Sequence, residues 1–348
     1  MGRGRKPARR VESNHEFVAD AAPGCHLSTR LAALAPWVLG SSLYDPDDFE
    51  EGVALPDLAF AGDTKELTAV NTTAAARVFY VSTPHDCVGR LGPLALGTSR
   101  DEAGATTPCT TLIVLVPPAT LLRLCRLQLP KRAVLVVDSD VSAWIPAPVS
   151  SSLLDVAALP CYSFPLEGAG PFLCTQGWGG ALTHFMSAST WHALDFRVSV
   201  GTPLRSLAAG TVASVRVGTR CSGIHVSNLF SWNSVIVAHD DGFYAEFVHI
   251  ASACVVTGQR VAAGEQIGTS GEAGFAPEPH LHLQARARAS RLLFQLKPTH
   301  VFYADVQVQA SMDPAAPTVP FALRGGNGGA FVPTAGRWYD ATDGARHV

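Results

Sequence analysis

The sequence predicts a mainly β protein, with an antiparallel β-sheet or β-sandwich domain preceded by a smaller β-sandwich-like domain. The 348 residues include 31 Gly and 24 Pro, and Val and Thr are frequent, a composition typical of strands and turns. Short apolar runs alternate with Gly, Pro and Asp clusters along most of the chain. Residues 233–250 contain two such runs joined by Asp240-Asp241-Gly242, which favours a β-hairpin.

Residues 1–55 are expected to form an irregular leader or a poorly formed targeting segment. The first ten residues, MGRGRKPARR, are strongly basic, and YDPDDFEE at 44–51 is acidic. The nearest apolar run, LAALAPWVLG at 31–40, is broken by a proline and lies far from the basic start. A signal peptide is therefore not clearly visible.

Residues 56–150 are expected to form a β-rich accessory domain. The runs ELTAVNTT, ARVFYVST, TTLIVLVPP and RAVLVVDSD are short and separated by turn-forming residues. This pattern favours a small antiparallel sandwich. Residues 56–150 contain no recognisable set of catalytic residues.

Residues 160–325 are expected to form the principal domain, followed by a C-terminal tail at 326–348. The hairpin at 233–250 is followed by VVTGQRVAAGEQIG, whose glycines suit tight β-turns. Glycine-rich hairpins of this kind also occur in lipoyl and biotinyl carrier domains. Residues 201–296 contain no lysine for such an attachment, so the sequence argues against a carrier.

Composition excludes several classes of protein. A formal charge of −3 provides no basic field for nucleic acid. No run of about 18 apolar residues predicts a membrane span. The eight cysteines include no Cys-x-x-Cys pair, which argues against a zinc ribbon or a thioredoxin-type site and leaves disulfide pairing open.

The stretch EPHLHLQAR at 278–286 places two histidines one residue apart in an alternating, strand-like run. Side chains at i and i+2 of a strand share one face, so His280 and His282 look into the same space. Histidines are concentrated in this half of the chain, and imidazole and carboxylate are natural ligands of a catalytic zinc. The candidates are His184, His192, Asp195, His225, His239, His249, His280 and His282.

The order of these pieces resembles the lysostaphin-type zinc peptidases, the M23 family of peptidoglycan endopeptidases. The resemblance covers about 165–290 and rests on GGALTHFMSASTWHALDF, VGTPLRSLAAGTV, NSVIVAHDDG, EFVHI, TGQRVAAGEQIGTSG and PHLHLQ. It implies a lysostaphin-type catalytic fold, with zinc bound by a histidine, Asp195 and His282. It also implies that His249 and His280 handle protons and transition-state charge.

The first ligand has two candidates. In the common family pattern a histidine stands four residues before the aspartate, whereas His192 stands three before Asp195 and His184 eleven before it. In an alternating strand, an offset of three sends His192 and Asp195 to opposite faces. Some family members have a longer spacer ending in a similar ALDF strand. We therefore favour His184 and expect His192 to be structural.

The resemblance also bears on neighbouring positions. His239 and His225 are expected to be hydrogen-bonded structural residues, and Asn233 matches an asparagine near the family's substrate cleft. Phe247 stands where the family commonly has a tyrosine, which puts one transition-state donor in doubt.

The resemblance implies a zinc metalloendopeptidase that hydrolyses peptide bonds in bacterial cell-wall peptidoglycan, with water activated by Zn²⁺ and histidines as general acid and base. Such a protein would be secreted, periplasmic or associated with the cell wall. The alternative is a non-catalytic domain of the same fold that binds cell wall or activates a wall hydrolase. The bond that is cut and the oligomeric state are not determined by the sequence.

Overall fold

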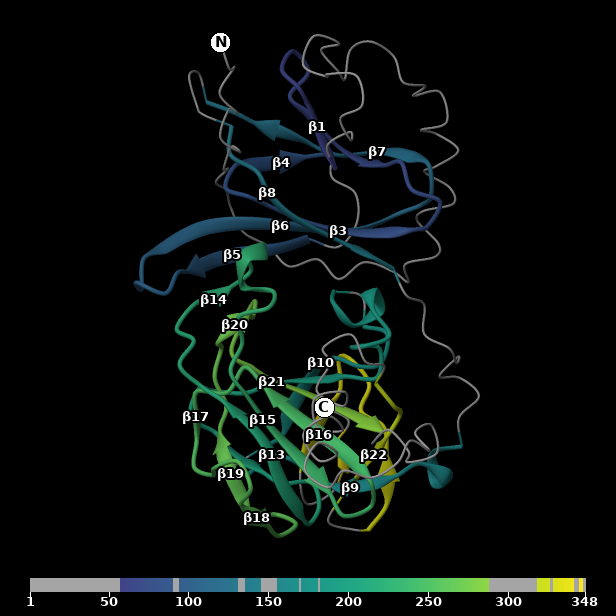
Figure 1. Ribbon diagram of the computed structural model, residues 1–348, viewed down its shortest axis with the longest axis vertical. Coiled ribbons are helices and arrows are strands. Elements are labelled where there is room, and N and C mark those ends of the chain that lie inside the picture. Colours follow the sequence, from purple (N-terminus) through teal and green to yellow (C-terminus); the bar gives the residue numbers. More distant parts are fainter. Residues whose placement is uncertain are drawn as a thin grey trace, which may run out of the picture. The chain divides into compact units, whose positions relative to one another are not determined.

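The computed structural model describes residues 57–89, 94–130, 135–144, 155–168, 170–180, 182–287, 318–325, 328–340 and 344–346 (Figure 1). Helical structure in these ranges consists of short 3₁₀ turns, η3 (Val156–Ala158), η4 (His184–Met186) and η5 (Val226–Asn228). The remaining regular structure is β-strand, so the expected mainly β fold class is confirmed. Within the described ranges no helix is long and apolar enough to cross a membrane. The expected leader at 1–55 lies outside them.

The chain forms two compact units. The first contains Met1–Trp144 and Arg220–Phe230, and the second contains Ile145–Thr219 and Ser231–Val348. The chain therefore leaves the second unit after Thr219 and returns to it at Ser231. The domain limits expected from sequence, 56–150 and 160–325, stay a prediction.

The first unit contains two antiparallel sheets. One has the order β1-β2-β7-β4, and in the other the strands of this unit follow the order β14-β5-β6-β3-β8. A single apolar cluster includes Phe79, Leu112 and Leu124, all fully buried. The strands are β1 (Leu58–Ala61), β2 (Glu66–Asn71), β3 (Arg77–Thr83), β4 (Asp86–Val88), β5 (Leu94–Arg100), β6 (Thr106–Val116), β7 (Thr120–Gln128), β8 (Asp138–Ala143) and β14 (Ser222–Gly223).

Segment 220–230 is built into this first unit. Its strand β14 pairs with β5 in the register Ser222↔Arg100, and Ile224 is fully buried. The N–H of Val226 donates to Ser82 Oγ at 2.9 Å. An apolar side chain and buried hydrogen bonds therefore fix the segment to a sheet that is remote in sequence.

The second unit is organised by an antiparallel sheet with the order β18-β13-β15-β16-β21-β11-β10-β24-β25 (Figure 1). Two smaller sheets have the orders β12-β19-β17 and β23-β22-β9, in which β22 and β9 are parallel. The larger sheet consists of β10 (Phe172–Gln176), β11 (Leu194–Arg197), β13 (Gly210–Arg216), β15 (Ser234–His239), β16 (Phe243–Val248), β18 (Arg260–Val261), β21 (His280–Ala287), β24 (Trp338–Asp340) and β25 (Gly344–Arg346). The other strands are β9 (Cys161–Ser163), β12 (Pro203–Arg205), β17 (Ser252–Ala253), β19 (Gln266–Thr269), β20 (Gly274–Phe275), β22 (Ala322–Arg324) and β23 (Ala330–Phe331).

The C-terminal residues participate in this unit. β24 pairs with β10 in the register Leu173↔Trp338, and β24 also pairs with β25. The tail expected at 326–348 therefore supplies strands. Its few apolar residues, interrupted by glycines, gave no alternation from which these short strands could be predicted.

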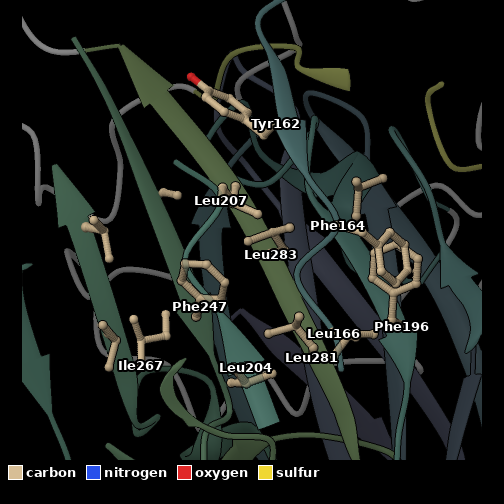
Figure 2. Close-up of a cluster of buried hydrophobic side chains, with 14 of the residues drawn as sticks. Tyr162, Phe164, Leu166, Phe196, Leu204, Leu207, Phe247, Ile267, Leu281 and Leu283 are labelled. Atoms are coloured by element: carbon tan, nitrogen blue, oxygen red, sulfur yellow. The ribbon is translucent and has the colours of Figure 1, made fainter. Parts of the chain in front are cut away.

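One face of the large sheet forms the core of the second unit. Phe247, Leu281 and Leu283 point into an apolar cluster together with Phe196 and Leu204 (Figure 2). In a strand the residues between these apolar positions point to the opposite face. That opposite face carries the histidines of β21.

Candidate metal centre

Strand register brings a carboxylate and an imidazole together on the polar face of the sheet. Asp195 of β11 lies opposite His282 of β21, which is also paired with Val248 of β16. Leu283 on the same strand is fully buried in the core, so alternation sends His282 to the other face. The distance from His282 Nδ1 to Asp195 Oδ1 is 2.9 Å.

The third member of the cluster comes from a turn. His184 opens η4, after β10 has ended at Gln176, and its side chain is fully buried. Its Nε2 atom lies 3.2 Å from Asp195 Oδ1 and 3.3 Å from His282 Nδ1. His184, Asp195 and His282 thus form a buried group whose ligand atoms all lie within 4.8 Å of one another.

Hydrogen bonds on the far side of each ring determine which nitrogen faces the cluster. His184 Nδ1 lies 2.9 Å from the carbonyl oxygen of Gly177, which can only accept. His282 Nε2 lies 3.2 Å from Gln284 Oε1, while Gln284 Nε2 donates to Glu246 Oε2. Both rings therefore direct a lone pair at Asp195 Oδ1.

Three acceptors that converge on one point need a cation between them. Two neutral imidazoles and one carboxylate form a donor set that suits a catalytic zinc, which takes three protein ligands and keeps one position open. Partners that orient metal-bound histidines from behind are also typical of such sites. The residues therefore fit a metal ion, and zinc in particular.

Electrostatics within the cluster agree with this interpretation. Burial disfavours the charged form of Asp195, but His184, His280 and His282 outweigh burial and hold the pKa of Asp195 well below its usual range. Burial lowers the pKa of His282, but the carboxylate of Asp195 outweighs it and the pKa of His282 is raised. The carboxylate thus favours the positively charged form of His282.

Two further histidines lie beside the cluster. His249 Nδ1 lies 2.7 Å from the carbonyl oxygen of Ala273, and His280 Nδ1 lies 2.8 Å from that of Glu278. Each ring therefore keeps a proton on Nδ1 and a free lone pair on Nε2. The ring centroids of His249 and His280 are 4.5 Å apart, and His280 Nε2 is 3.9 Å from Asp195 Oδ1.

His249 is held in an unusual conformation. It follows the last residue of β16 and has a φ of 63°, a left-handed value that residues other than glycine rarely adopt. A Cβ at Gly271 would lie 2.6 Å from the carbonyl oxygen of His249, so only glycine fits there. Burial first, then the nearby His280 and His282, hold the pKa of His249 well below its usual range, so this imidazole is neutral near pH 7.

His192 lies outside the group formed by His184, Asp195 and His282. Its Nδ1 atom lies 3.1 Å from the carbonyl oxygen of Thr318, and its ring packs edge-on against Trp178. Burial lowers its pKa. Strand β11 begins at Leu194, so the parity argument extended a strand pattern to a residue that precedes the strand. His184, and not His192, lies beside Asp195 and His282, while its role as a ligand stays a prediction.

The two remaining histidine candidates, His239 and His225, are not members of the His184, Asp195 and His282 group. His239 ends β15 beside the ring of Tyr162, but its buried ring nitrogens have no hydrogen-bond partner among the described residues, so the expected hydrogen bonding is wrong there. His225 pairs with Asp138 at 3.2 Å in the first unit, as a hydrogen-bonded residue should. Asn233 ties the backbone of Thr219 to that of Ile250, next to His249.

Phe247 has no access to the site. It is fully buried in the core (Figure 2). Phe247 pairs with Leu283, so it lies on the opposite face of the sheet from His282. A phenol at this position would also point away from the cluster. The absence of a tyrosine here therefore removes no donor from the site.

Sequence reasoning missed the side chains that hold the ligands in place. Gln284 could have been found, because it follows His282 by two residues in the same strand and shares its face. Gln176 could not, because its contact with Asp195 depends on the pairing of β10 with β11 across a loop. Only strand register reveals that contact.

The antiparallel sheet and its buried His-Asp-His group define a β domain with a candidate metal centre. Residues 189–293 match the family model described as Peptidase family M23. The resemblance inferred from the motifs is thus confirmed. His184 lies just before the matched range.

The similar curated proteins are distant. The chain is 25% identical over 118 residues to the peptidoglycan DD-endopeptidase ShyA of Vibrio cholerae, a match covering 34% of this chain and 24% of that protein. It is 33% identical over 94 residues to the glycyl-glycine endopeptidase ALE-1 of Staphylococcus capitis, covering 27% of this chain and 24% of that protein. The chain thus spans about a quarter of the length of these relatives.

Among solved structures, the catalytic domain of lysostaphin from Staphylococcus simulans matches with a TM-score of 0.26 and 23% identity. That match covers 36% of this chain and 83% of the lysostaphin domain.

Proposed function

We propose that this protein is a zinc-dependent endopeptidase that hydrolyses peptide bonds in bacterial cell-wall peptidoglycan. The observation that carries the proposal is the convergence of three buried acceptor atoms, from His184, Asp195 and His282, beside two imidazoles with free Nε2 atoms. The first feature suits a metal and the second suits proton transfer. The family of the domain supports the same chemistry.

His184, Asp195 and His282 would hold the metal. Zinc bound there would lower the pKa of a bound water towards about 7 and polarise the scissile carbonyl. The hydrogen bonds that the ligand rings donate to the Gly177 carbonyl and to Gln284 Oε1 would keep these rings in the required tautomers. Burial of all three ligands excludes bulk water and strengthens each electrostatic interaction.

His249 and His280 would handle the proton and the developing charge. The lowered pKa of His249 keeps its Nε2 available as an acceptor at neutral pH. It can therefore take a proton from the attacking water and return it to the leaving amine. His280, whose Nε2 lies 3.9 Å from Asp195 Oδ1, would stabilise the charge at the reacting carbonyl once that Nε2 carries a proton.

The substrate assignment rests on the relatives, which are named as peptidoglycan and glycyl-glycine endopeptidases. Short peptides of the wall would be the partners, and nucleic acid would not. With a substrate of this kind, the protein would be secreted, periplasmic or associated with the cell wall.

Metal content and wall digestion, measured on the same preparations, test this proposal. The purified chain should contain about one zinc ion and release new amino termini from purified peptidoglycan. His184→Ala should lose both properties. The matched control His192→Ala should keep its zinc, because His192 is held by Thr318 away from the cluster.

Two outcomes would contradict the proposal. Zinc that is lost in His192→Ala and kept in His184→Ala would show that the ligand set is wrong. A zinc-loaded protein that binds peptidoglycan without cutting it would instead be the non-catalytic wall-binding module.

A further inference from the structure

Gln176 is a buried residue whose side-chain amide contacts one candidate ligand, Asp195, and the loop just before another, His184. It ends β10 and is 7% exposed. Its Oε1 atom accepts hydrogen bonds from the N–H groups of Leu182 and Thr183, at 3.1 and 2.9 Å. Its Nε2 atom donates to Asp195 Oδ2 at 2.6 Å and to Thr183 Oγ1 at 3.0 Å. Each of its polar atoms therefore has two partners.

The loop before His184 is shaped around this amide. A Cβ at Gly180 would lie 3.0 Å from Gln176 Cβ and 3.2 Å from Gln176 Oε1. A side chain at Gly180 would thus press on the amide. Because two backbone donors face Oε1, the orientation of the amide is fixed and the NH₂ group must face Asp195.

This contact makes the two oxygens of Asp195 unequal. Oδ2 is occupied by the amide of Gln176, whereas Oδ1 faces His184 Nε2 and His282 Nδ1. A carboxylate with both oxygens free can bind a metal through both. A catalytic zinc has three protein ligand atoms and one position for water or substrate, so a second carboxylate oxygen would make the ion five-coordinate.

We propose that Gln176 is a positioning residue that restricts Asp195 to binding metal through Oδ1 alone and thereby keeps the bound ion four-coordinate, with one of its four positions left for water or substrate. The inference rests on the proposed zinc site. Through Leu182 and Thr183 the same amide also fixes the loop that delivers His184. One neutral side chain thus orients two of the three ligands.

Two variants separate the hydrogen bond from the fold. Gln176→Glu keeps an oxygen that accepts from Leu182 and Thr183 but replaces the donor to Asp195 with a second acceptor. Gln176→Leu removes all four hydrogen bonds and tests the whole contribution. Gln284→Leu is the matched control, because it removes a buried amide from behind His282 and leaves the carboxylate untouched.

The measurements are the visible absorption of the Co²⁺-substituted full chain and the dissociation constant for Zn²⁺. The parent and Gln284→Leu should give the intense absorption of four-coordinate Co²⁺. Gln176→Glu and Gln176→Leu should give the weaker absorption of a five-coordinate ion. The dissociation constant for Zn²⁺ should rise about 10- to 100-fold in Gln176→Leu and in Gln284→Leu.

Folded Gln176→Glu protein with the parent's Co²⁺ spectrum would overturn the inference, and so would the same spectral change in Gln284→Leu. If Gln176→Leu does not fold, Gln176→Glu decides alone. Failure of the proposed function has a different signature. In that case the parent protein binds Co²⁺ with an intense spectrum and still releases no amino termini from peptidoglycan.

Discussion

At the scale of single residues, His280 and His282 share a strand face but present different nitrogens to the cluster. His282 approaches Asp195 through Nδ1, with Nε2 held by Gln284. His280 has Nδ1 held by the carbonyl oxygen of Glu278, and its Nε2 remains 3.9 Å from Asp195. We therefore propose that these hydrogen bonds to the far nitrogens separate a metal ligand, His282, from a proton-handling group, His280.

This division predicts distinct phenotypes for three alanine variants. His282→Ala should lose both zinc and hydrolysis because a ligand is removed. His280→Ala and His249→Ala should keep zinc while hydrolysis falls on the order of 10²-fold or more, the usual effect of losing a positioned acid or base. Elemental analysis and peptide-cleavage rates on the three proteins would test this. Folded His280→Ala protein without zinc, or fully active His249→Ala protein, would contradict the division.

The raised pKa of His282 predicts that metal binding depends on pH. In the metal-free protein, Asp195 favours the protonated form of His282, so a metal must displace that proton. Affinity for Zn²⁺ should therefore increase as the pH rises through the raised pKa, and binding below it should release about one proton. Calorimetry in buffers of different ionisation enthalpy measures that release. Affinity that does not change between pH 6 and 8 would argue against proton displacement at His282.

At the scale of elements, the alternation of apolar and polar residues along β21 was enough to predict much of the candidate site. It placed His280 and His282 on one face, and the motifs around Asp195 and His249 supplied their partners. The spacing of His184 could not be resolved by periodicity alone, because this residue lies in a turn after β10. The contact between Gln176 and Asp195 could not be predicted, since two strands must pair before the side chains meet.

Gly271, in the turn before β21, packs against the backbone of His249 and allows a test of how His249 is held in place. Gly271→Ala would place a Cβ 2.6 Å from both the N of Ala251 and the O of His249. The backbone must shift, which should cost about 1–3 kcal/mol of the free energy of unfolding and displace the His249 ring. Zinc should remain bound while hydrolysis falls.

Urea unfolding and cleavage rates check this prediction. Gly62→Ala is the matched control, because a Cβ there has nothing within 4 Å and should change neither quantity. Gly271→Ala protein with the stability and rate of the parent would mean that the backbone accommodates the methyl group without moving His249.

At the scale of the whole molecule, the three candidate ligands all belong to the second unit, while segment 220–230 belongs to the first. Ile224 is fully buried there, with its side chain 3.6 Å from the position a Cβ would take on Gly97. Composition and turn signals predicted β domains on both sides of residue 150. They could not predict this insertion, because β14 is only two residues long and its partner β5 lies far away in sequence.

Because segment 220–230 belongs to the first unit, we expect that a change in it can lower the stability of that unit without affecting metal binding. In the full chain, Ile224→Ala should lower the free energy of unfolding of the first unit by about 2–5 kcal/mol, the usual cost of a cavity in a packed core. Zinc content should stay at the level of the parent. Denaturant unfolding and elemental analysis would be compared. A folded Ile224→Ala protein that has lost its zinc would show that the metal centre depends on this segment.

Reconstitution of the metal-free protein tests the central claim most directly. After chelation, the full chain should release no new amino termini from purified peptidoglycan, and one equivalent of Zn²⁺ should restore their release, with mass analysis identifying the cut bond. A chelated protein that still cleaves, or a zinc-loaded protein that never does, would contradict the assignment of His184, Asp195 and His282 as the catalytic zinc site of a peptidoglycan endopeptidase.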